Sequence, residues 1–467
     1  MFKKASIRRI LQRHPDNNEK QYRSEVIRIA WPVLLELMLS SLFGMIDMMM
    51  LGNMPNRTLA NQAVAAVGIV NQPMLLGMAL IQSLNVGGTA IIARYLGADQ
   101  KHRIEQTLKH VVLISFFGLA IPCFFLLQWF APTIMGLLGA EATVVKVGTP
   151  YFRIVLVGFL FTSINMSFTA ALRGVGETKA PMRINLIANS LNVVGNAILI
   201  YGLLGVPALG IVGAAISTAF SNFLAFLLMI QHVTSGKSII HFNLKNKFQF
   251  SKDIAYNLVK IGVPASGEQL IMRVGVMLFV RIVAGLGTTV FAAHQIALNI
   301  LGLSFNPGSA FGIAASSLVG YSLGQKSPEL AMEYAKEARQ LGSFISTCIA
   351  VCFLLFAPQL ASLYNKDPEV IRNAALALRI IAFIQPFQSS QLILSGALRG
   401  AGDTLWTMIA TIVGVLILRV SLGALFVNVF EWGIAGAWLA VLIDQFFRWL
   451  IVYARFRSGH WKKIVIR

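Results

Sequence analysis

The sequence predicts an all-α polytopic membrane protein, with twelve transmembrane helices in two pseudo-symmetric six-helix bundles. Its composition, a series of long apolar runs and an internal repeat are the observations behind this prediction. Of the 467 residues, 56% are hydrophobic and 12% are charged, whereas about 25% of the residues of an ordinary soluble protein are charged. So little charge cannot cover a globular surface. A mean hydropathy of +0.70 over the whole chain also excludes a soluble domain on a single anchor.

The apolar runs have the length of about 20 residues that a helix needs to cross a bilayer core of about 30 Å. Their limits are residues 26–52, 63–93, 106–131, 146–172, 179–203, 207–232, 254–285, 289–323, 338–364, 369–398, 404–430 and 433–456. The first six runs form an N-lobe over 26–232 and the last six a C-lobe over 254–456, with a polar linker over 233–253 between them. Residues 1–25 are basic and lack the small-residue cleavage site of a signal peptide, so we expect them and residues 457–467 to be tails.

Basic residues predict the orientation of these spans. The chain has 39 Lys and Arg against 19 Asp and Glu, which gives a formal charge of +20. Both tails and one alternate set of loops hold most of these basic residues, and the other set of loops holds little beyond Arg57, Lys146, Lys366 and Arg372. Because Lys and Arg collect in cytoplasmic loops, both termini are predicted to be cytoplasmic. The positive charge therefore requires no nucleic-acid partner.

Short motifs recur along the chain at a nearly constant offset. Ala-Leu-Arg-Gly at residues 171–174 returns at 397–400, and Leu-Gly at 96–97 returns at 323–324. Chance matches would not keep the offset so constant, so the two lobes are predicted to be copies of one unit. Because six spans is an even number, both copies enter the membrane from the same side. This is the parallel-repeat plan of some secondary transporters.

The longest repeated element is a helix junction with the pattern Leu-Arg-Gly-x-Gly-acid-Thr. An Arg in the last helical turn, a Gly at the cap, and then an acid and a Thr at the start of the next helix suit a short structural or hinge loop. The residues of this loop motif are Arg173, Gly174 and Gly176 in the N-lobe, and Arg399, Gly400 and Gly402 in the C-lobe.

Two carboxylates lie within the first span. Because a charge in the bilayer centre costs at least about 2.5–3.5 kcal/mol, an intramembrane acid is a candidate functional residue. Glu36 and Asp47 are eleven residues apart, which places them about 20° apart around the helix and about 16 Å apart along it. Each acid is either structurally paired or part of a transport site. Glu268 follows Pro264 by four residues, as Glu36 follows Pro32, so we interpret Glu268 as the repeat counterpart of Glu36.

Amide side chains form stripes on two further spans, four on one face of the fifth span and three on one side of the eighth. They are Asn185, Asn189, Asn192 and Asn196 on the fifth span, and Gln295, Asn299 and Asn306 on the eighth. Such amides either hold helices together by interhelical hydrogen bonds or line a polar site. Beside an ionisable carboxylate, their oxygens suit a site that alternates between a proton and a hard monovalent cation.

Two six-span lobes, with Leu-Arg-Gly-x-Gly-acid-Thr closing the fourth and tenth helices, resemble the multidrug and toxic compound extrusion (MATE) transporters over residues 20–456. Many members have an aspartate late in the first helix and two polar residues on the fifth, and some complete a cation site with a Thr on the sixth. The resemblance matches these to Asp47, to Asn192 and Asn196, and to Thr218. With Glu36, these are the cation-coupling residues that we predict, for H⁺ or Na⁺.

The resemblance also implies the activity of an exporter. It would move lipophilic, usually cationic small molecules outward in exchange for inward H⁺ or Na⁺, by alternating access. We predict that its substrate cavity is lined by Asn185, Asn189, Gln295, Asn299 and Glu268. We expect a monomer in the plasma membrane of a bacterium. We expect no catalytic residue, no cofactor, and no metal beyond a possible Na⁺ at Asp47, Asn192 and Asn196.

Two other functions stay open. A flippase for lipid-linked oligosaccharides would need cations in its cavity to hold pyrophosphate, and Arg273 and Arg281 are the deep candidates. A membrane enzyme would need a cluster of His or carboxylate side chains, whereas His294 stands alone in its span. Asp444 and Arg448 in the last span are spaced for an ion pair within one helix.

Overall fold

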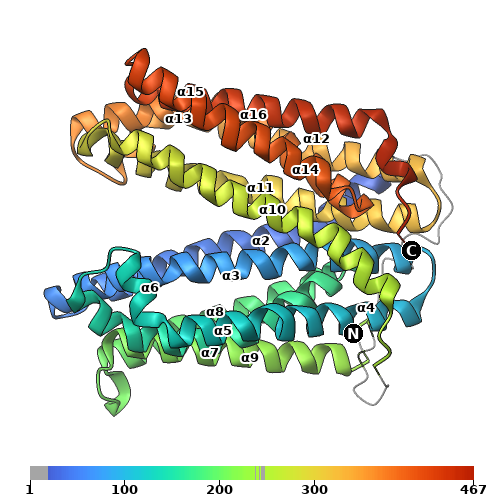
Figure 1. Ribbon diagram of the computed structural model, residues 1–467, viewed down its shortest axis with the longest axis horizontal. Helices are drawn as coiled ribbons and strands as arrows, with labels where there is room; N and C mark the ends of the chain where they lie inside the picture. The colour runs from blue at the N-terminus through green and yellow to red at the C-terminus, as the bar shows by residue number, and fades with distance from the viewer. Residues whose placement is uncertain (1–18, 237, 241, 243–247, 467) are drawn as a thin grey trace.

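The computed structural model describes residues 19–236, 238–240, 242 and 248–466, and these residues form helices and no strand. The helices lie in two bundles, which run side by side in Figure 1. The N-lobe contains α2 (Glu19–Gly52), α3 (Arg57–Gly97), α4 (Lys101–Leu113), η1 (Ile114–Ala120), α5 (Ile121–Trp129), α6 (Ala131–Leu137), α7 (Ala142–Gly174), α8 (Lys179–Tyr201), η2 (Leu203–Gly205) and α9 (Gly210–Thr234). The C-lobe contains α10 (Lys252–Ala284), α11 (Thr288–Gly324), α12 (Pro328–Ser362), α13 (Pro368–Ala401), α14 (Thr404–Thr411), η3 (Ile412–Arg419), α15 (Val420–Ala424), η4 (Leu425–Val429), α16 (Gly433–Ser458) and η5 (His460–Lys463).

Each predicted span corresponds to one helix or to one continuous helical run, such as α4, η1 and α5. The prediction of an all-α fold with twelve spans in two bundles is therefore confirmed. Eleven of the described helical runs are long and apolar enough to cross a membrane. The run that falls short is α10, whose apolar part carries three charged residues, Glu268, Arg273 and Arg281.

Two helices begin well before their predicted spans. Helix α2 begins at Glu19 and α12 at Pro328, where the apolar runs predict starts at 26 and 338. The first turns of α12 bury Ala331 and Tyr334 on one side. An amphipathic turn of this kind is stabilised by its buried face alone, and a search for continuous apolar runs overlooks it.

The two lobes are joined at one end of the molecule and separate at the other. We call the end that carries Glu19, the inter-lobe linker and the C-terminus the basal end, and the opposite end the distal end (Figure 1). At the basal end one hydrophobic core contains residues of both lobes, among them Leu172 and Leu398. Toward the distal end each lobe has its own core, around Phe152 in the N-lobe and Trp438 in the C-lobe.

The two lobes approach each other closely at the repeated Leu-Gly motif. A Cβ atom on Gly97 would overlap the carbonyl oxygen of Tyr321, and a Cβ atom on Gly324 would overlap the carbonyl oxygen of Arg94. Each built Cβ would also lie 3.0 Å from the Cα atom of the other glycine. Only glycine fits at these two positions, so the repeated motif lets α3 and α11 meet at backbone distance.

Candidate functional site

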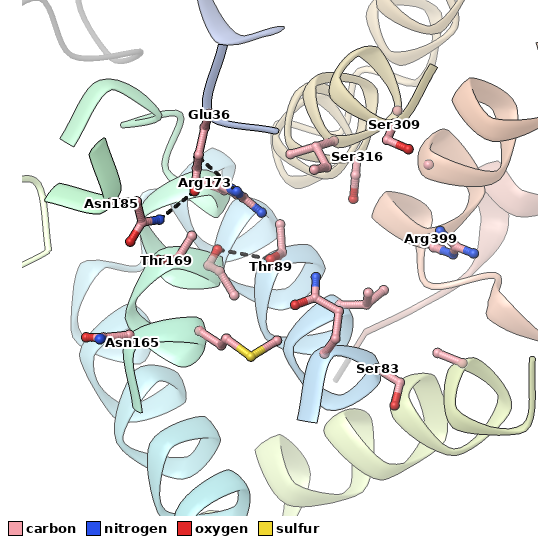
Figure 2. A pocket seen from close by; sticks show the side chains of 18 of the residues that line it. Glu36, Ser83, Thr89, Asn165, Thr169, Arg173, Asn185, Ser309, Ser316 and Arg399 are labelled. Atoms are coloured by element: carbon pink, nitrogen blue, oxygen red, sulfur yellow. Dashed lines mark hydrogen bonds and ion pairs between the residues drawn. The ribbon is translucent and has the colours of Figure 1, made fainter. Parts of the chain in front are cut away.

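The loop-motif arginine of the N-lobe reaches back to a carboxylate on the first span. Arg173 lies in the last turn of α7, and its Nη2 atom donates a hydrogen bond of 3.0 Å to Oε2 of Glu36 on α2. Asn185 on α8 donates its Nδ2 hydrogen to the other oxygen, Oε1, at 2.6 Å. Figure 2 shows the three side chains converging from three helices. Glu36 is thus buried with both carboxylate oxygens bonded.

The C-lobe repeats this arrangement. Nη2 of Arg399, at the end of α13, donates to Oε1 of Glu268 on α10 at 2.6 Å, and the hydroxyl of Thr407 on α14 donates to Oε2 at 2.9 Å. Three residues therefore occupy equivalent places in both lobes. They are the glutamate that follows the proline, the arginine of the loop motif, and a polar residue of the helix after that motif. Sequence reasoning placed both arginines in helix caps and missed their partners. The sequence did contain an indication of this pairing, because each lobe has one glutamate four residues after a proline and one loop-motif arginine.

The other residues of the loop motif hold the helix junctions. Gly176 and Gly402 have positive φ angles of 74° and 87°, a conformation that favours glycine. A Cβ atom on Gly174 would lie 2.9 Å from the carbonyl oxygen of Thr89, and one on Gly400 would overlap that of Ser316. The glycines therefore set the turn and the close approach of neighbouring helices.

The acids of the two motifs bind other segments at the basal end. Glu177 accepts hydrogen bonds of 2.8 Å from the Ser238 hydroxyl and from the backbone N–H of Ile239 in the linker. Asp403 accepts one of 2.7 Å from Nε of Arg455 near the end of α16. The N-lobe motif thus fixes the linker, and the C-lobe motif fixes the last helix.

A cavity of about 390 Å³ lies between the lobes and is lined by both ion pairs. The remaining polar lining consists of amides and hydroxyls, namely Gln82, Ser83, Thr89, Thr162, Asn165, Thr169, Asn185, Asn189, Asn222, Gln269, Ser309 and Ser316. In Figure 2, Arg399 lies across the cavity from Glu36 and Arg173. The cavity thus brings together charged groups that the sequence repeats, the arginines at an interval of 226 residues and the glutamates at 232.

The predicted cavity residues separate into two groups. Asn185, Asn189 and Glu268 are among the residues that line the cavity. Gln295 and Asn299 are not, because they lie on the distal half of α11, whereas its cavity-lining residues begin at Ser309. Instead, Nδ2 of Asn299 donates to the backbone oxygen of Gln295 at 2.9 Å.

The predicted cation-coupling residues cluster around Asp47, with one exception. Nδ2 of Asn196 donates a hydrogen bond of 2.8 Å to Oδ1 of Asp47. The surrounding hydrogen bonds favour the orientation of Asn192 in which its amide nitrogen donates to Oδ2 of Asp47 at 3.1 Å and its oxygen accepts from the Thr218 hydroxyl at 3.2 Å. Glu36 is the exception, because it lies in the cavity with Arg173.

This cluster offers oxygen atoms to a hard cation. The Asp47 carboxylate is half-buried, and Oδ1 of the buried Asn196 has no hydrogen-bond partner among the described residues. Carboxylate and amide oxygens are ligands that hard cations prefer. The residue types present therefore fit a proton or a small monovalent cation, and the coupling ion stays a prediction.

Two sequence interpretations of charged residues change. Asp444 does not pair with Arg448. Its Oδ2 accepts a hydrogen bond of 2.8 Å from Nε of Arg419, the last residue of η3, which packs against α16. Arg448 instead donates to the Thr411 hydroxyl at 3.4 Å. Arg273 and Arg281 are exposed on α10 outside the cavity lining, and the cations that line the cavity are the loop-motif arginines.

The two repeat-related six-helix lobes enclose a polar cavity, and one helix that lines it also carries a cluster of a carboxylate and amides. These features define a membrane transporter of the two-lobe type. A sequence model of the MatE family matches residues 32–198 and 264–425. The chain therefore belongs to the MATE family of transporters, and the resemblance drawn from the loop motif is confirmed.

Relatives match along nearly the whole chain. A probable multidrug resistance protein NorM of Thermotoga maritima is 28% identical over 463 residues, which cover 96% of this chain and 95% of the relative. Multidrug resistance protein NorM of Vibrio vulnificus is 27% identical over 433 residues, which cover 91% and 92%. A solved structure of a multidrug resistance MATE family transporter in an outward-facing conformation has a TM-score of 0.85 and 23% identity, covering 94% of this chain and 95% of that one. That likeness shows the shared fold.

Proposed function

We propose that the protein is a multidrug efflux transporter that exports lipophilic, usually cationic compounds in exchange for inward H⁺ or Na⁺. The observation that carries the proposal is the hydrogen-bonded Asp47 and Asn196 cluster on α2, the helix that also lines the cavity through Glu36. The names of the Thermotoga maritima and Vibrio vulnificus relatives support the export of varied small molecules.

Asp47 would couple ion uptake to the α2–α8 contact through a change of hydrogen bonding. As a carboxylate, it accepts the Asn196 Nδ2 hydrogen. Once protonated, it gains a donor and loses an acceptor. The Asn196 amide then turns over, so that its unpaired oxygen accepts the new proton. Asp47 on α2 thus accepts from Asn196 on α8 when it is charged and donates to it when it is protonated. This exchange of donor and acceptor gives the N-lobe two arrangements.

The lobes would open alternately to the two sides of the membrane. Most of the basic residues in loops fall at the basal end, so we assign the basal end, with both termini, to the cytoplasm of a bacterial cell. The shared core and the Gly97–Gly324 contact then close the cytoplasmic side. Because one chain supplies both lobes, we infer that a monomer suffices.

The flippase alternative has weaker support. It requires guanidinium groups free to hold a pyrophosphate, and Arg173 and Arg399 do line the cavity. However, each is paired with a glutamate, at 3.0 Å and 2.6 Å, and the pairs leave the cavity without net positive charge. We therefore favour drug export.

The experiment is ethidium efflux from vesicles energised by an imposed H⁺ or Na⁺ gradient, with Asp47→Asn against wild type. We expect the variant to lose gradient-driven efflux by at least about fivefold, because an amide cannot change charge. Asp367→Asn is the matched control: Asp367 caps α13 by accepting from the backbone N–H of Glu369 at 2.8 Å, and Asn caps equally well. Undiminished efflux by Asp47→Asn refutes the coupling role, and the gradient that drives the wild type identifies the ion.

A further inference from the structure

The C-lobe has its own position corresponding to Asp47, and a different type of residue occupies it. Asp47 follows Glu36 by eleven residues on α2, and Phe279 follows the counterpart glutamate, Glu268, by eleven residues on α10. The N-lobe therefore places a carboxylate, and the C-lobe an aromatic ring, at the equivalent point of its first helix. At this point the C-lobe offers no oxygen ligand to a cation.

The facing helix differs as well. Helix α8 and the helical run that begins with α14 are counterparts, because the loop motif precedes both. Arg419 lies 227 residues after Asn192, which is the offset of the repeated Leu-Gly motif. Asn192 brings an amide to Asp47, whereas Arg419 brings a guanidinium whose Cζ atom lies 5.9 Å from the centre of the Phe279 ring. That distance suits a cation–π contact. The C-lobe thus has a positive charge where the N-lobe has an amide.

The carboxylate of the C-lobe comes from a third helix. Asp444 lies on α16, which is the counterpart of α9 because both begin with Gly-Ile-x-Gly-Ala. In the N-lobe, Ser217 and Thr218 of α9 lie beside the Asn192 amide. Asp444 lies one helical turn beyond the residue that corresponds to Ser217, and its Oδ2 accepts from both Nε and Nη2 of Arg419. Equivalent helices therefore build both clusters, with the acid on the first helix in the N-lobe and on the last in the C-lobe.

Asp444 is sealed from solvent, whereas Asp47 is half-buried. The side chain of Asp444 is 0% exposed and that of Arg419 is 10% exposed. The second oxygen of Asp444, Oδ1, packs against Gly414, where a Cβ atom would overlap it. A carboxylate buried in a membrane protein needs a compensating positive charge. Here the chain itself supplies that charge, on a side chain that cannot leave.

A second arginine lies close by without taking this role. Arg448 follows Asp444 by one helical turn and is 3% exposed. It donates to the hydroxyl of Thr411 at 3.4 Å and forms no ion pair with Asp444. Arg419 is therefore the bonded cation, and Arg448 is the group that would compete for Asp444 if Arg419 were removed.

We propose that the C-lobe contains a counterpart of the Asp47 cation site and that the guanidinium group of Arg419 fills it permanently as a tethered cation. This inference rests on the proposed function for its consequence, which is that the N-lobe alone exchanges the coupling ion. Without the Arg419 side chain, the space between Asp444 and the Phe279 ring becomes a site for a free guanidinium ion, which is planar and has N–H donors for the carboxylate.

The test is chemical rescue of Arg419→Ala. The full-length variant is purified in detergent, and its melting temperature is measured in millimolar guanidinium chloride or in choline chloride at the same ionic strength. Choline has no N–H group to donate to Asp444. We expect the variant to melt below wild type and guanidinium, but not choline, to restore at least half of the loss, because a ligand that binds only the folded state stabilises it. Wild type should respond to neither salt.

Three variants assign the rescue to the charge on Asp444. Arg419→Ala combined with Asp444→Ala removes both charges, so it should melt above the single variant and not respond to guanidinium. Arg419→Lys keeps a tethered cation and should melt above Arg419→Met, whose side chain is of similar length but neutral. This pair decides the question if Arg419→Ala cannot be purified. Arg379→Ala removes an exposed arginine of α13 and should behave as wild type.

The outcomes separate this inference from the proposed function. Absence of guanidinium rescue in Arg419→Ala overturns the inference, as do equal rescue of the double variant and equal melting temperatures of Arg419→Lys and Arg419→Met. These measurements use no gradient, so they stand even if ethidium efflux fails. Where efflux identifies the coupling ion, equilibrium binding of that ion should disappear in Asp47→Asn, and binding that survives would show that the N-lobe is not the one exchanging site.

Discussion

Removal of one hydroxyl at the basal end should shift the balance between this arrangement of the lobes and the opposite one. The hydroxyl of Tyr334 on α12 donates to the carboxylate of Glu25 on α2, and this bond joins the C-lobe to the N-lobe. Tyr334 is fully buried and Glu25 is 5% exposed. The other Glu25 oxygen accepts a longer bond of 3.4 Å from Gln21. Tyr334 is thus the strong donor to a carboxylate that water hardly reaches.

The change Tyr334→Phe keeps the ring and removes only the hydroxyl. A hydrogen bond to a charged group is worth about 1.5–3 kcal/mol, which corresponds to a factor of about 10 to 150 in an equilibrium constant. The carboxylate regains water when the lobes part at the basal end. The variant should therefore populate the basally open arrangement more by about that factor.

Distances between spin labels at the distal ends measure this shift. Leu204 in the N-lobe and Leu363 in the C-lobe are 87% and 78% exposed, and the three free cysteines, replaced by Ser, leave a clean background. Lobes that separate at the basal end approach each other at the distal end. Tyr334→Phe should therefore add a shorter distance population in double electron–electron resonance of the protein in membranes.

The matched control is Tyr364→Phe, which removes the hydroxyl of a tyrosine that is 47% exposed. It should leave the distance distribution as in wild type. An unchanged distribution in Tyr334→Phe would refute the reasoning, because it would mean that the Glu25 bond does not favour one arrangement of the lobes.

Two further substitutions test other contacts. Gly324→Leu drives a side chain into the carbonyl oxygen of Arg94 and should shift the same spin-label distances, while Gly302→Leu, where open space surrounds a Cβ atom, should not. Equal distributions in these two variants would contradict the close contact. Asp444→Ala strands Arg419 without its partner and should lower the free energy of unfolding by about 3–5 kcal/mol. Thermal unfolding in detergent measures this loss, and a melting temperature equal to that of wild type would count against the pair.

Features that depend on one helix at a time were predictable from the sequence. The spans follow from runs of apolar residues, and the repeat follows from shared motifs. The Asp47 cluster was predictable because Asn192 and Asn196 share one face of α8, so any helix packed there meets both. The same reasoning failed for Gln295 and Asn299, since a stripe does not reveal how far along its helix the cavity extends.

Partners between helices were not predictable. Arg173 and Glu36 are separated by 137 residues, and Arg399 and Glu268 by 131. A long flexible side chain such as Arg reaches several neighbours, and its choice depends on helix packing that no local pattern encodes. Asp444 illustrates this point, because the spacing to Arg448 suits a pair within one helix, while Arg419 supplies the observed partner from outside it.

The meeting of Gly97 with Gly324 has a consequence for the origin of the two-lobed chain. Each glycine faces the Cα atom of the other glycine and the carbonyl oxygen of the residue three positions before that other glycine. The two halves of the contact are therefore equivalent. That is the geometry of an isologous interface, in which one surface binds a copy of itself about a two-fold axis. A single six-helix unit with this Leu-Gly surface would carry both sides of the joint. The fused chain thus preserves, within one polypeptide, the form of a symmetric homodimer.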